Sequence, residues 1–239
     1  EKRDCHCGWC MNVCLRGGAN GHITATSAQA FRIGDSNPGK VHVSWGGVGR
    51  NIAHNLVLLG DGVELLTIFG GGVFGPVIEK ACRDIGIGTD HCDIADEHTH
   101  SFFVSVNNSD GELVGGIADM DAVEGMDTAW IAARLDVINA ADAVVADSNL
   151  LPETLAFLID HAEKPLYLDA VSVAKAGRIR EAMALSSRKS VFALKSNALE
   201  YESLAGLEGV TRFYESAGAE GIRVHAVGEL YEYHALPCI

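Results

Sequence analysis

The chain has 239 residues, of which 48% are hydrophobic and 21% are charged, so it can bury the core of one α/β domain. Its formal net charge of −14 argues against a surface for nucleic acid or anionic membranes, because such surfaces need clustered Lys and Arg. No apolar run has the length of a membrane span and no signal-peptide pattern is present, so we expect a cytoplasmic protein.

Four of the seven cysteines crowd the start of the chain, at Cys5, Cys7, Cys10 and Cys14. Thiolates are soft ligands, so this run could hold zinc or an iron–sulfur cluster. However, the spacing matches no standard knuckle and no second ligand pair follows. We therefore favour reduced thiols in a poorly ordered extension over residues 1–11. An odd cysteine count with scattered positions does not indicate a disulfide framework.

Strand-like apolar runs alternate with helical patterns along the rest of the chain. The expected strands are 11–15, 63–69, 101–106, 113–118, 143–146, 166–168, 191–194, 224–227 and 230–233, with a hairpin turn at 107–111. The expected helices are 51–59, 76–85, 130–140, 152–162, 178–185 and 199–205, and the segment 211–216 fits either type. This alternation predicts βαβ units and an α/β fold with a mainly parallel sheet. Ligands of such sheets bind at the carboxyl ends of the strands.

A glycine cluster links the alternating segment around Val43 to the helix that opens at Asn51. It reads Gly46-Gly47-Val48-Gly49. Glycines between a strand and a helix let the backbone approach a ligand, and the helix start directs unpaired N–H donors to the same place. An ordinary glycine-rich turn is the alternative interpretation.

This stretch resembles the first signature of the PfkB (ribokinase-like) family of carbohydrate and nucleoside kinases. Asn-Pro-Gly-Lys before Gly-Gly-Val-Gly-Arg-Asn-Ile-Ala is most like the pseudouridine kinase branch of that family. Further pieces follow in family order, at Gly17-Gly18-Ala19-Asn20, Phe74-Gly75, Ile117-Ala118-Asp119-Met120-Asp121, Ala146-Asp147-Ser148-Asn149, Leu168-Asp169 and Leu194-Lys195-Ser196-Asn197. Each piece is weak alone, whereas the set is specific. The resemblance implies a ribokinase-like three-layer αβα sandwich over residues 12–239, with a small β lid from about 20–45 and 98–118.

The resemblance also implies a pocket for the phosphate acceptor. Its residues would be Asn20, His22, Gly46, Gly47, Arg50 and Asn51. Asparagine suits this role because its amide both donates to and accepts from ribose hydroxyls. The family usually has an Asp at the position of His22, and this chain also lacks the acids that the family has near Gly71 and Gly72.

The nucleotide site that the resemblance implies lies further along the chain. An Asn-x-x-Glu motif at Asn197 and Glu200 would act on Mg²⁺ through water, and Lys195 would contact phosphate. Ser216, Gly218 and Gly221 resemble the Thr-x-Gly-x-x-Gly nucleotide loop, with Ser in place of Thr. The alternatives are a helix cap with a first-turn acid, and a plain turn. Asp169 could be a ligand or a structural cap. The chain has no P-loop motif.

Together these motifs imply an ATP-dependent and Mg²⁺-dependent kinase that phosphorylates the 5′-hydroxyl of a pseudouridine-like nucleoside or of a sugar. The family's Gly-Ala-Gly-Asp motif, which supplies the anion hole and the catalytic base, has no equivalent in the 239 residues. We therefore identify no catalytic residue, and the alternative is an incomplete chain or a pseudokinase that binds without catalysis. The family resemblance also allows a homodimer through the lid.

A third hypothesis rests on spacing alone. Gly70-x-Gly72-x-x-Gly75 follows a strand-like run and precedes a helix, as in a dinucleotide fingerprint, and Asp90 or Asp93 would be the required acid. The family order explains Phe74-Gly75 better.

Overall fold

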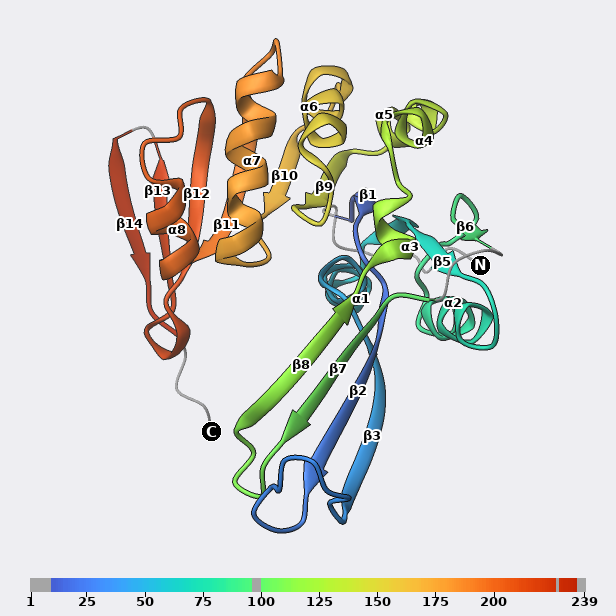
Figure 1. Cartoon of the computed structure of the whole chain (residues 1–239). Coiled ribbons are helices and arrows are strands. Elements are labelled where there is room, and N and C mark those ends of the chain that lie inside the picture. The colour runs from blue at the N-terminus through green and yellow to red at the C-terminus, as the bar shows by residue number, and fades with distance from the viewer. Residues whose placement is uncertain (1–9, 96–99, 227, 236–239) are drawn as a thin grey trace.

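The computed structural model describes residues 10–95, 100–226 and 228–235. Residues 1–9 of the expected extension, with Cys5 and Cys7, lie outside this part, as do residues 98 and 99 of the expected lid. The described chain forms an eight-stranded sheet with helices on its faces, and a four-stranded sheet projects from it (Figure 1). A third sheet has only two short strands, β5 (Ile68–Gly70) and β6 (Asp93–Ala95).

The large sheet has the strand order β14-β13-β12-β11-β10-β9-β1-β4. Its strands are β1 (Asn12–Arg16), β4 (Gly62–Leu66), β9 (Ala143–Asp147), β10 (Leu166–Asp169), β11 (Val191–Asn197), β12 (Val210–Ser216), β13 (Ile222–Ala226) and β14 (Glu229–Tyr233). All pairs from β4 to β12 are parallel, and only β13 and β14 at one edge are antiparallel. The prediction of a mainly parallel sheet is therefore confirmed.

Helices cover the large sheet in two layers because successive strand residues point to opposite faces. The helices are α1 (Val48–Leu59), α2 (Phe74–Asp84), α3 (Asp121–Glu124), α4 (Thr128–Ala132), α5 (Leu135–Ala140), α6 (Pro152–His161), α7 (Val173–Leu185) and α8 (Ala198–Leu204). Leu15 of β1 shares an apolar cluster with Ala53 of α1, whereas its neighbour Cys14 shares another with Leu158 of α6. This arrangement is the three-layer αβα sandwich that the resemblance implied.

Several element boundaries differ from the sequence prediction. The expected strand over 63–69 is two strands, because the chain turns at Thr67 so that β5 pairs with β6. The expected helix over 130–140 breaks near Arg134, whose guanidinium donates to the carbonyl of His91 and pairs with Asp93. Helix α7 begins five residues earlier than expected, and the ambiguous segment 211–216 is part of strand β12.

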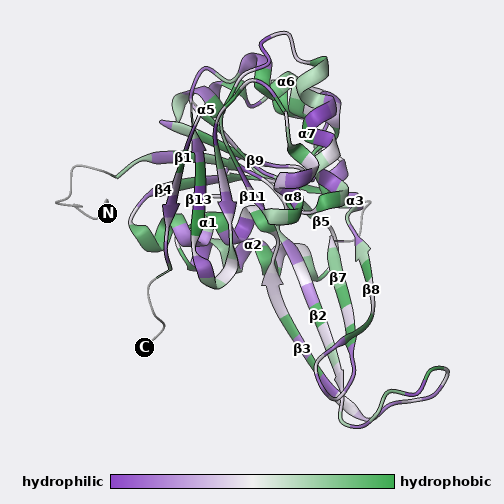
Figure 2. Ribbon diagram, turned by 90° about the vertical axis from the view of Figure 1, so that its left-hand side faces the viewer, coloured by the Kyte–Doolittle hydropathy of each residue, from purple (hydrophilic) through white to green (hydrophobic). Residues whose placement is uncertain are grey.

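The four-stranded sheet, which we call the lid, extends beyond the helices as a single layer (Figure 2). Its order is β3-β2-β7-β8, with β2 (Asn20–Ser27), β3 (Gly39–Gly46), β7 (Phe102–Asn107) and β8 (Leu113–Asp119). The pairing register places Ile23, Val43, Val104 and Ile117 on one face. His22 and Thr24 lie on the other face. The lid therefore has one apolar face and one more polar face, and the polar face continues into Asn20.

None of the helices in the described part of the chain combines the length and the apolar character that crossing a bilayer requires.

Candidate functional site

The strand ends of the large sheet carry two groups of residues that the sequence singled out. We call residues 17–22, residues 46–51 and Asn149 the acceptor end. We call Asn197, Glu200 and residues 216–221 the nucleotide end.

The acceptor end is built from backbone packed on backbone. A Cβ added to Gly49 would lie 2.6 Å from the Cα of Gly17, and one added to Gly17 would lie 2.7 Å from the Cα of Gly49. Gly47 has a φ of 95°, which lets β3 turn directly into α1. The N–H of Arg50 donates to the carbonyl of Gly18 at 3.1 Å. The glycines are therefore required by the packing of α1 against the end of β1, whatever ligand binds there.

Two asparagine amides meet beside Gly18. Asn20 is 6% exposed; its Nδ2 donates to the sulfur of Met120, and its Oδ1 has no hydrogen-bond partner within the described residues. The Oδ1 of Asn149 accepts from the ammonium of Lys175. Since Lys175 can only donate, the NH₂ group of Asn149 faces Gly18. The pair thus offers one free acceptor and one donor, which suits sugar hydroxyls. The sequence did not predict roles for Asn149 and Lys175.

His22 covers this end from the polar face of the lid. A Cβ at Gly46 would lie 2.8 Å from the ring of His22, so Gly46 makes room for that ring. The ring also lies edge-on to Phe103, with centroids 5.9 Å apart. Burial lowers the pKa of His22, so near neutral pH the ring is uncharged. The usual family Asp is thus replaced by a neutral group.

Two buried charged residues, Asp147 and Arg16, support the floor of the acceptor end. Asp147 is 1% exposed and accepts hydrogen bonds from the N–H of Gly18 at 3.1 Å and of Asn149 at 3.0 Å. Burial raises the pKa of Asp147, and the charge of Arg16 opposes that rise. Arg16 is itself buried, and its Nη2 donates to the carbonyl of Met126 at 3.3 Å. Arg16 and Asp147 each end an apolar strand, and this position of a charged residue is the sequence feature that could have predicted their role.

A cavity of about 640 Å³ runs along α1 from Asn51 of the acceptor end to Lys195 of β11, and none of the nucleotide-end residues lines it. Asn51, Asp169 and Lys195 all line it, although they come from three different elements. The ammonium of Lys195 lies 3.3 Å from the carboxylate of Asp169. The other carboxylate oxygen of Asp169 accepts from the N–H of Val171, whose φ of 61° is unusual for a β-branched residue. Asp169 therefore caps its own loop and also faces the cavity. Arg50 donates to Asn51 at 3.3 Å.

The Asn-x-x-Glu motif forms a complete capping box at the start of α8. The Oδ1 of Asn197 accepts from the N–H of Glu200 at 2.9 Å, and the Oε2 of Glu200 accepts from the N–H of Asn197 at 2.8 Å. The Oε1 of Glu200 also accepts from the amide of Asn197 at 2.9 Å. Both carboxylate oxygens of Glu200 are thus occupied, which fits contact with Mg²⁺ through water better than direct ligation. Within the described residues, no group of three or more His, Cys, Asp or Glu is placed to hold a metal ion.

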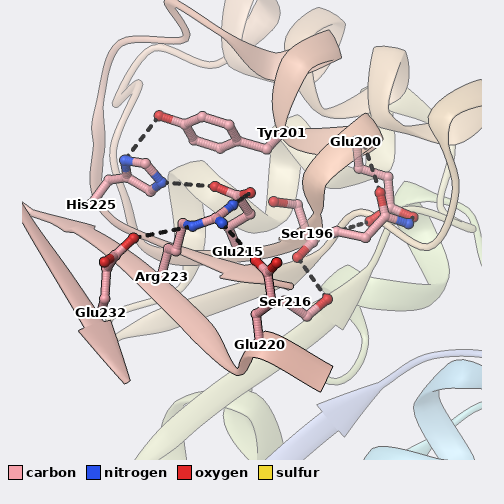
Figure 3. A network of polar contacts seen from close by, with 10 residues as sticks. Ser196, Glu200, Tyr201, Glu215, Ser216, Glu220, Arg223, His225 and Glu232 are labelled. Carbon is pink, nitrogen blue, oxygen red and sulfur yellow. Dashed lines mark hydrogen bonds and ion pairs between the residues drawn. The ribbon is translucent and has the colours of Figure 1, made fainter. Parts of the chain in front are cut away.

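The expected nucleotide loop lies next to this box. The hydroxyl of Ser216 donates to the carbonyl of Ser196 at 3.2 Å (Figure 3). Asn197, Ser216 and Gly218 share an open pocket of about 410 Å³, whose other lining residues are Ala198, Leu199, Ala217, Glu220 and Arg223. Gly221 does not line this pocket. A side chain at Gly221 would collide with the carbonyl of Tyr233, so this glycine serves the contact with β14.

The glycines of the possible dinucleotide fingerprint have another role. Gly70 ends β5, which lies outside the eight-stranded sheet, and a side chain at Gly75 would collide with the carbonyl of Gly70. They allow α2 to pack closely on β5. Because a dinucleotide fingerprint follows a strand of the central sheet, the fold does not support this third hypothesis.

Comparisons with known proteins agree with this geometry. The model of the pfkB family carbohydrate kinases matches residues 12–226. Pseudouridine kinase from Escherichia coli (strain K12) is 33% identical over 196 residues, which cover 82% of this chain and 61% of that protein. The chain thus spans less than two thirds of the length of this curated relative.

Two solved structures show the same fold. A carbohydrate kinase from Agrobacterium tumefaciens superposes with a TM-score of 0.81 at 27% identity, over 92% of this chain and 74% of that one. A ribokinase from Arabidopsis thaliana, solved with ribose and ATP, superposes with a TM-score of 0.81 over 96% of this chain and 79% of that one. At 17% identity the second likeness concerns the fold alone.

Proposed function

The chain belongs to the PfkB family of carbohydrate kinases, and on that premise we propose that it serves the transfer of the γ-phosphoryl group of ATP to the 5′-hydroxyl of a pseudouridine-like nucleoside. The observation that carries the proposal is the cavity lined by Asn51, Asp169 and Lys195. It starts at Asn51 of the acceptor end and reaches Lys195, two residues before Asn197 of the nucleotide end. A kinase needs this layout, because it must hold the acceptor and the nucleotide in line.

At the acceptor end, Asn20 and Asn149 would hold the ribose hydroxyls, and neutral His22 would close over them. A sugar that carries the same hydroxyls is the alternative acceptor. The likeness to a pseudouridine kinase supports a nucleoside.

At the nucleotide end, Ser216 and the backbone at Gly218 would contact the phosphates of ATP, with Lys195 as a counter-charge. Asn197 and Glu200 would hold Mg²⁺ through water. When bound, this ion neutralises part of the phosphate charge. The cytoplasm is the compartment that we expect, since the reaction consumes ATP.

A second candidate function is binding of the nucleoside without phosphoryl transfer. It is favoured by His22, which stands where the family usually has an Asp, and by the acids that this chain lacks near Gly71 and Gly72. One experiment separates the two functions. Pseudouridine, ribose and ATP·Mg²⁺ are titrated into the protein by calorimetry, and ADP release is then followed with each acceptor.

Saturable binding of pseudouridine and ATP, with ADP release that depends on pseudouridine, is the expected result. Asn20→Ala should weaken pseudouridine binding about tenfold, because it removes the buried acceptor, and leave ATP binding unchanged. Binding of both ligands without ADP release would select the binding protein. Failure of the wild-type protein to bind either ligand would contradict both functions.

We also propose a homodimer through the lid. Its apolar face exposes Val41, Val43 and Ile117, which are 69%, 45% and 72% exposed. A contiguous apolar sheet face of this kind marks an interaction surface. Light scattering after size exclusion should give twice the chain mass of 25.3 kDa. Ile117→Lys should yield monomers, whereas Thr24→Lys on the polar face should not. A monomeric wild-type protein would contradict the dimer.

A further inference from the structure

A single arginine at the nucleotide end joins three carboxylates from three segments (Figure 3). The Nη1 of Arg223 lies 3.0 Å from Glu215 of β12, and its Nη2 lies 3.0 Å from Glu220. Its Nε lies 3.4 Å from Glu232 of β14. Glu220 belongs to the short 3₁₀ turn η1 (Gly218–Glu220) inside the expected nucleotide loop. One planar guanidinium therefore ties two strands and this turn together.

Glu215 is the fixed point of this cluster. Its side chain is 7% exposed, and its second carboxylate oxygen lies 3.0 Å from the Nε2 of His225. The other ring nitrogen of His225 lies 3.2 Å from the hydroxyl of Tyr201 on α8, and the two rings stack with centroids 4.3 Å apart. A buried carboxylate held on both oxygens cannot move without losing those contacts. Glu215 directly precedes Ser216, so the cluster is anchored at the start of the loop.

Apart from the ion pair with Arg223, backbone hydrogen bonds hold the turn, among them one at 3.4 Å from the N–H of Ala235 to the carbonyl of Glu220. The side chain of Glu220 is 75% exposed, and the backbone bends at two glycines, Gly218 with φ 58° and Gly221 with φ 113°. Glycine backbones explore many conformations when nothing constrains them. The N–H of Ala217 donates to the carbonyl of Gly221 at 2.8 Å and closes the turn. The ion pair with Arg223 is then the side-chain contact that links the turn to the sheet.

Arg223 and Glu220 also line the same pocket as Asn197, Ser216 and Gly218. We propose that Arg223 is a positioning residue for the nucleotide: through Glu220 it holds residues 217–221 in the shape that receives the phosphates, with Glu215 as its anchor. The inference rests on the proposed function, because it assumes that a nucleotide binds in this pocket.

Removal of Glu220 should change the nucleotide affinity in opposite directions, depending on whether Glu220 holds the turn or only adds negative charge to the pocket. A carboxylate beside a phosphate site repels the ligand, so its removal should tighten nucleotide binding if only charge matters. If Glu220 holds the turn, its removal should weaken binding instead. The sign of the change in affinity therefore decides between the two explanations.

The test is calorimetric titration of ATP·Mg²⁺ into the full chain and its variants. Glu220→Ala should weaken binding about fivefold, the upper range for an exposed ion pair. Arg223→Lys keeps the charge but cannot make three contacts at once, and it should weaken binding by a similar factor. Glu202→Ala removes the same charge from an exposed site on α8 and should change the affinity less than twofold.

Pseudouridine binding serves as the check on folding, because the acceptor end shares no residue with the cluster. It should stay unchanged in all three variants. Unchanged or tighter ATP binding by Glu220→Ala, with normal wild-type binding, would overturn the inference alone. A wild-type protein that binds pseudouridine but no ATP would overturn the inference together with the nucleotide half of the proposed function.

Discussion

At the acceptor end backbone packs on backbone, whereas at the nucleotide end charged and polar side chains hold one another. At the acceptor end, Gly17 and Gly49 pack so closely that neither has room for a Cβ atom. At the nucleotide end, the contacts that hold the structure are the ion pairs of Arg223 and the capping box of Asn197 and Glu200. The close backbone packing of the acceptor end leaves no room for an added atom, but its stability does not depend on salt. The nucleotide end tolerates changes in side-chain size, but its stability depends on charge and hydrogen bonding.

The sharpest way to break this comparison is to add one methyl group at the acceptor end. Gly49→Ala would place a Cβ 2.6 Å from backbone that cannot move aside, and we expect it to lower the free energy of unfolding by about 3 kcal/mol. Urea unfolding measures this. The control is Gly177→Ala in α7, where a Cβ meets no atom within 4 Å, and it should stabilise the protein by about 0.5–1 kcal/mol. A loss below about 1 kcal/mol at Gly49 would show that the contact yields.

Close packing does not make every part of the molecule insensitive to solution conditions, because the buried His100 makes stability depend on pH. His100 is 2% exposed, stacks on Phe69, and its Nδ1 accepts from the N–H of Gly70 at 3.1 Å. Burial lowers the pKa of His100 from 6.5 to about 4. The unfolded chain therefore takes up a proton below pH 6.5 while the folded chain does not. The stability that neutral His100 supports is complete above pH 6.5 and falls as the pH drops toward 4.

The expected loss over that range is roughly 3 kcal/mol, measured as the difference between wild type and His100→Asn in urea unfolding at several pH values. The difference is needed because burial raises the pKa of Asp147 and Glu64, and these carboxyls act with the opposite sign in acid. Parallel stability curves for the two proteins between pH 4 and 6.5 would refute the assignment to His100.

The smallest change concerns the nucleotide end. Asn197→Ala removes the cap of α8 and should cost about 1 kcal/mol of stability, less than the glycine substitution, because the helix end is open to water. Thermal unfolding gives this number. It should also weaken ATP·Mg²⁺ binding if Asn197 faces the nucleotide. A stability loss equal to that of Gly49→Ala would remove the contrast between the two ends.

The periodicity of apolar residues predicted the main sheet and its two helical layers well. It failed where local sequence hides the geometry. Nothing in 63–69 marks the turn at Thr67, and Gly177 concealed the first turns of α7, since glycine is unfavourable inside helices. Segment 211–216 was ambiguous because only its pairing with β11 and β13 makes it a strand.

The candidate site was predicted in part for a similar reason. Asn20, Asn51, Asn197 and Ser216 lie in short contiguous motifs that can be recognised, and the structure places two of them at the acceptor end and two at the nucleotide end. Arg223 and Lys175 act through partners on other elements, so their roles depend on pairing that no local motif encodes. An arginine within the apolar strand β13, opposite Glu215 and Glu232 in the register, is the signal that could have been used.

The length of the lid means that any rotation at its base is amplified at its tip. Its strand β2 leaves the packed acceptor end at Asn20 and Gly21, where the ring of Phe102 fills the space beside the glycine. Eight residues of strand reach about 26 Å from that point. Each degree of rotation at the base therefore moves the tip by about 0.5 Å. His22 is only one residue beyond Gly21. A ligand that moves His22 by rotating the lid would therefore displace the tip of the lid several times further.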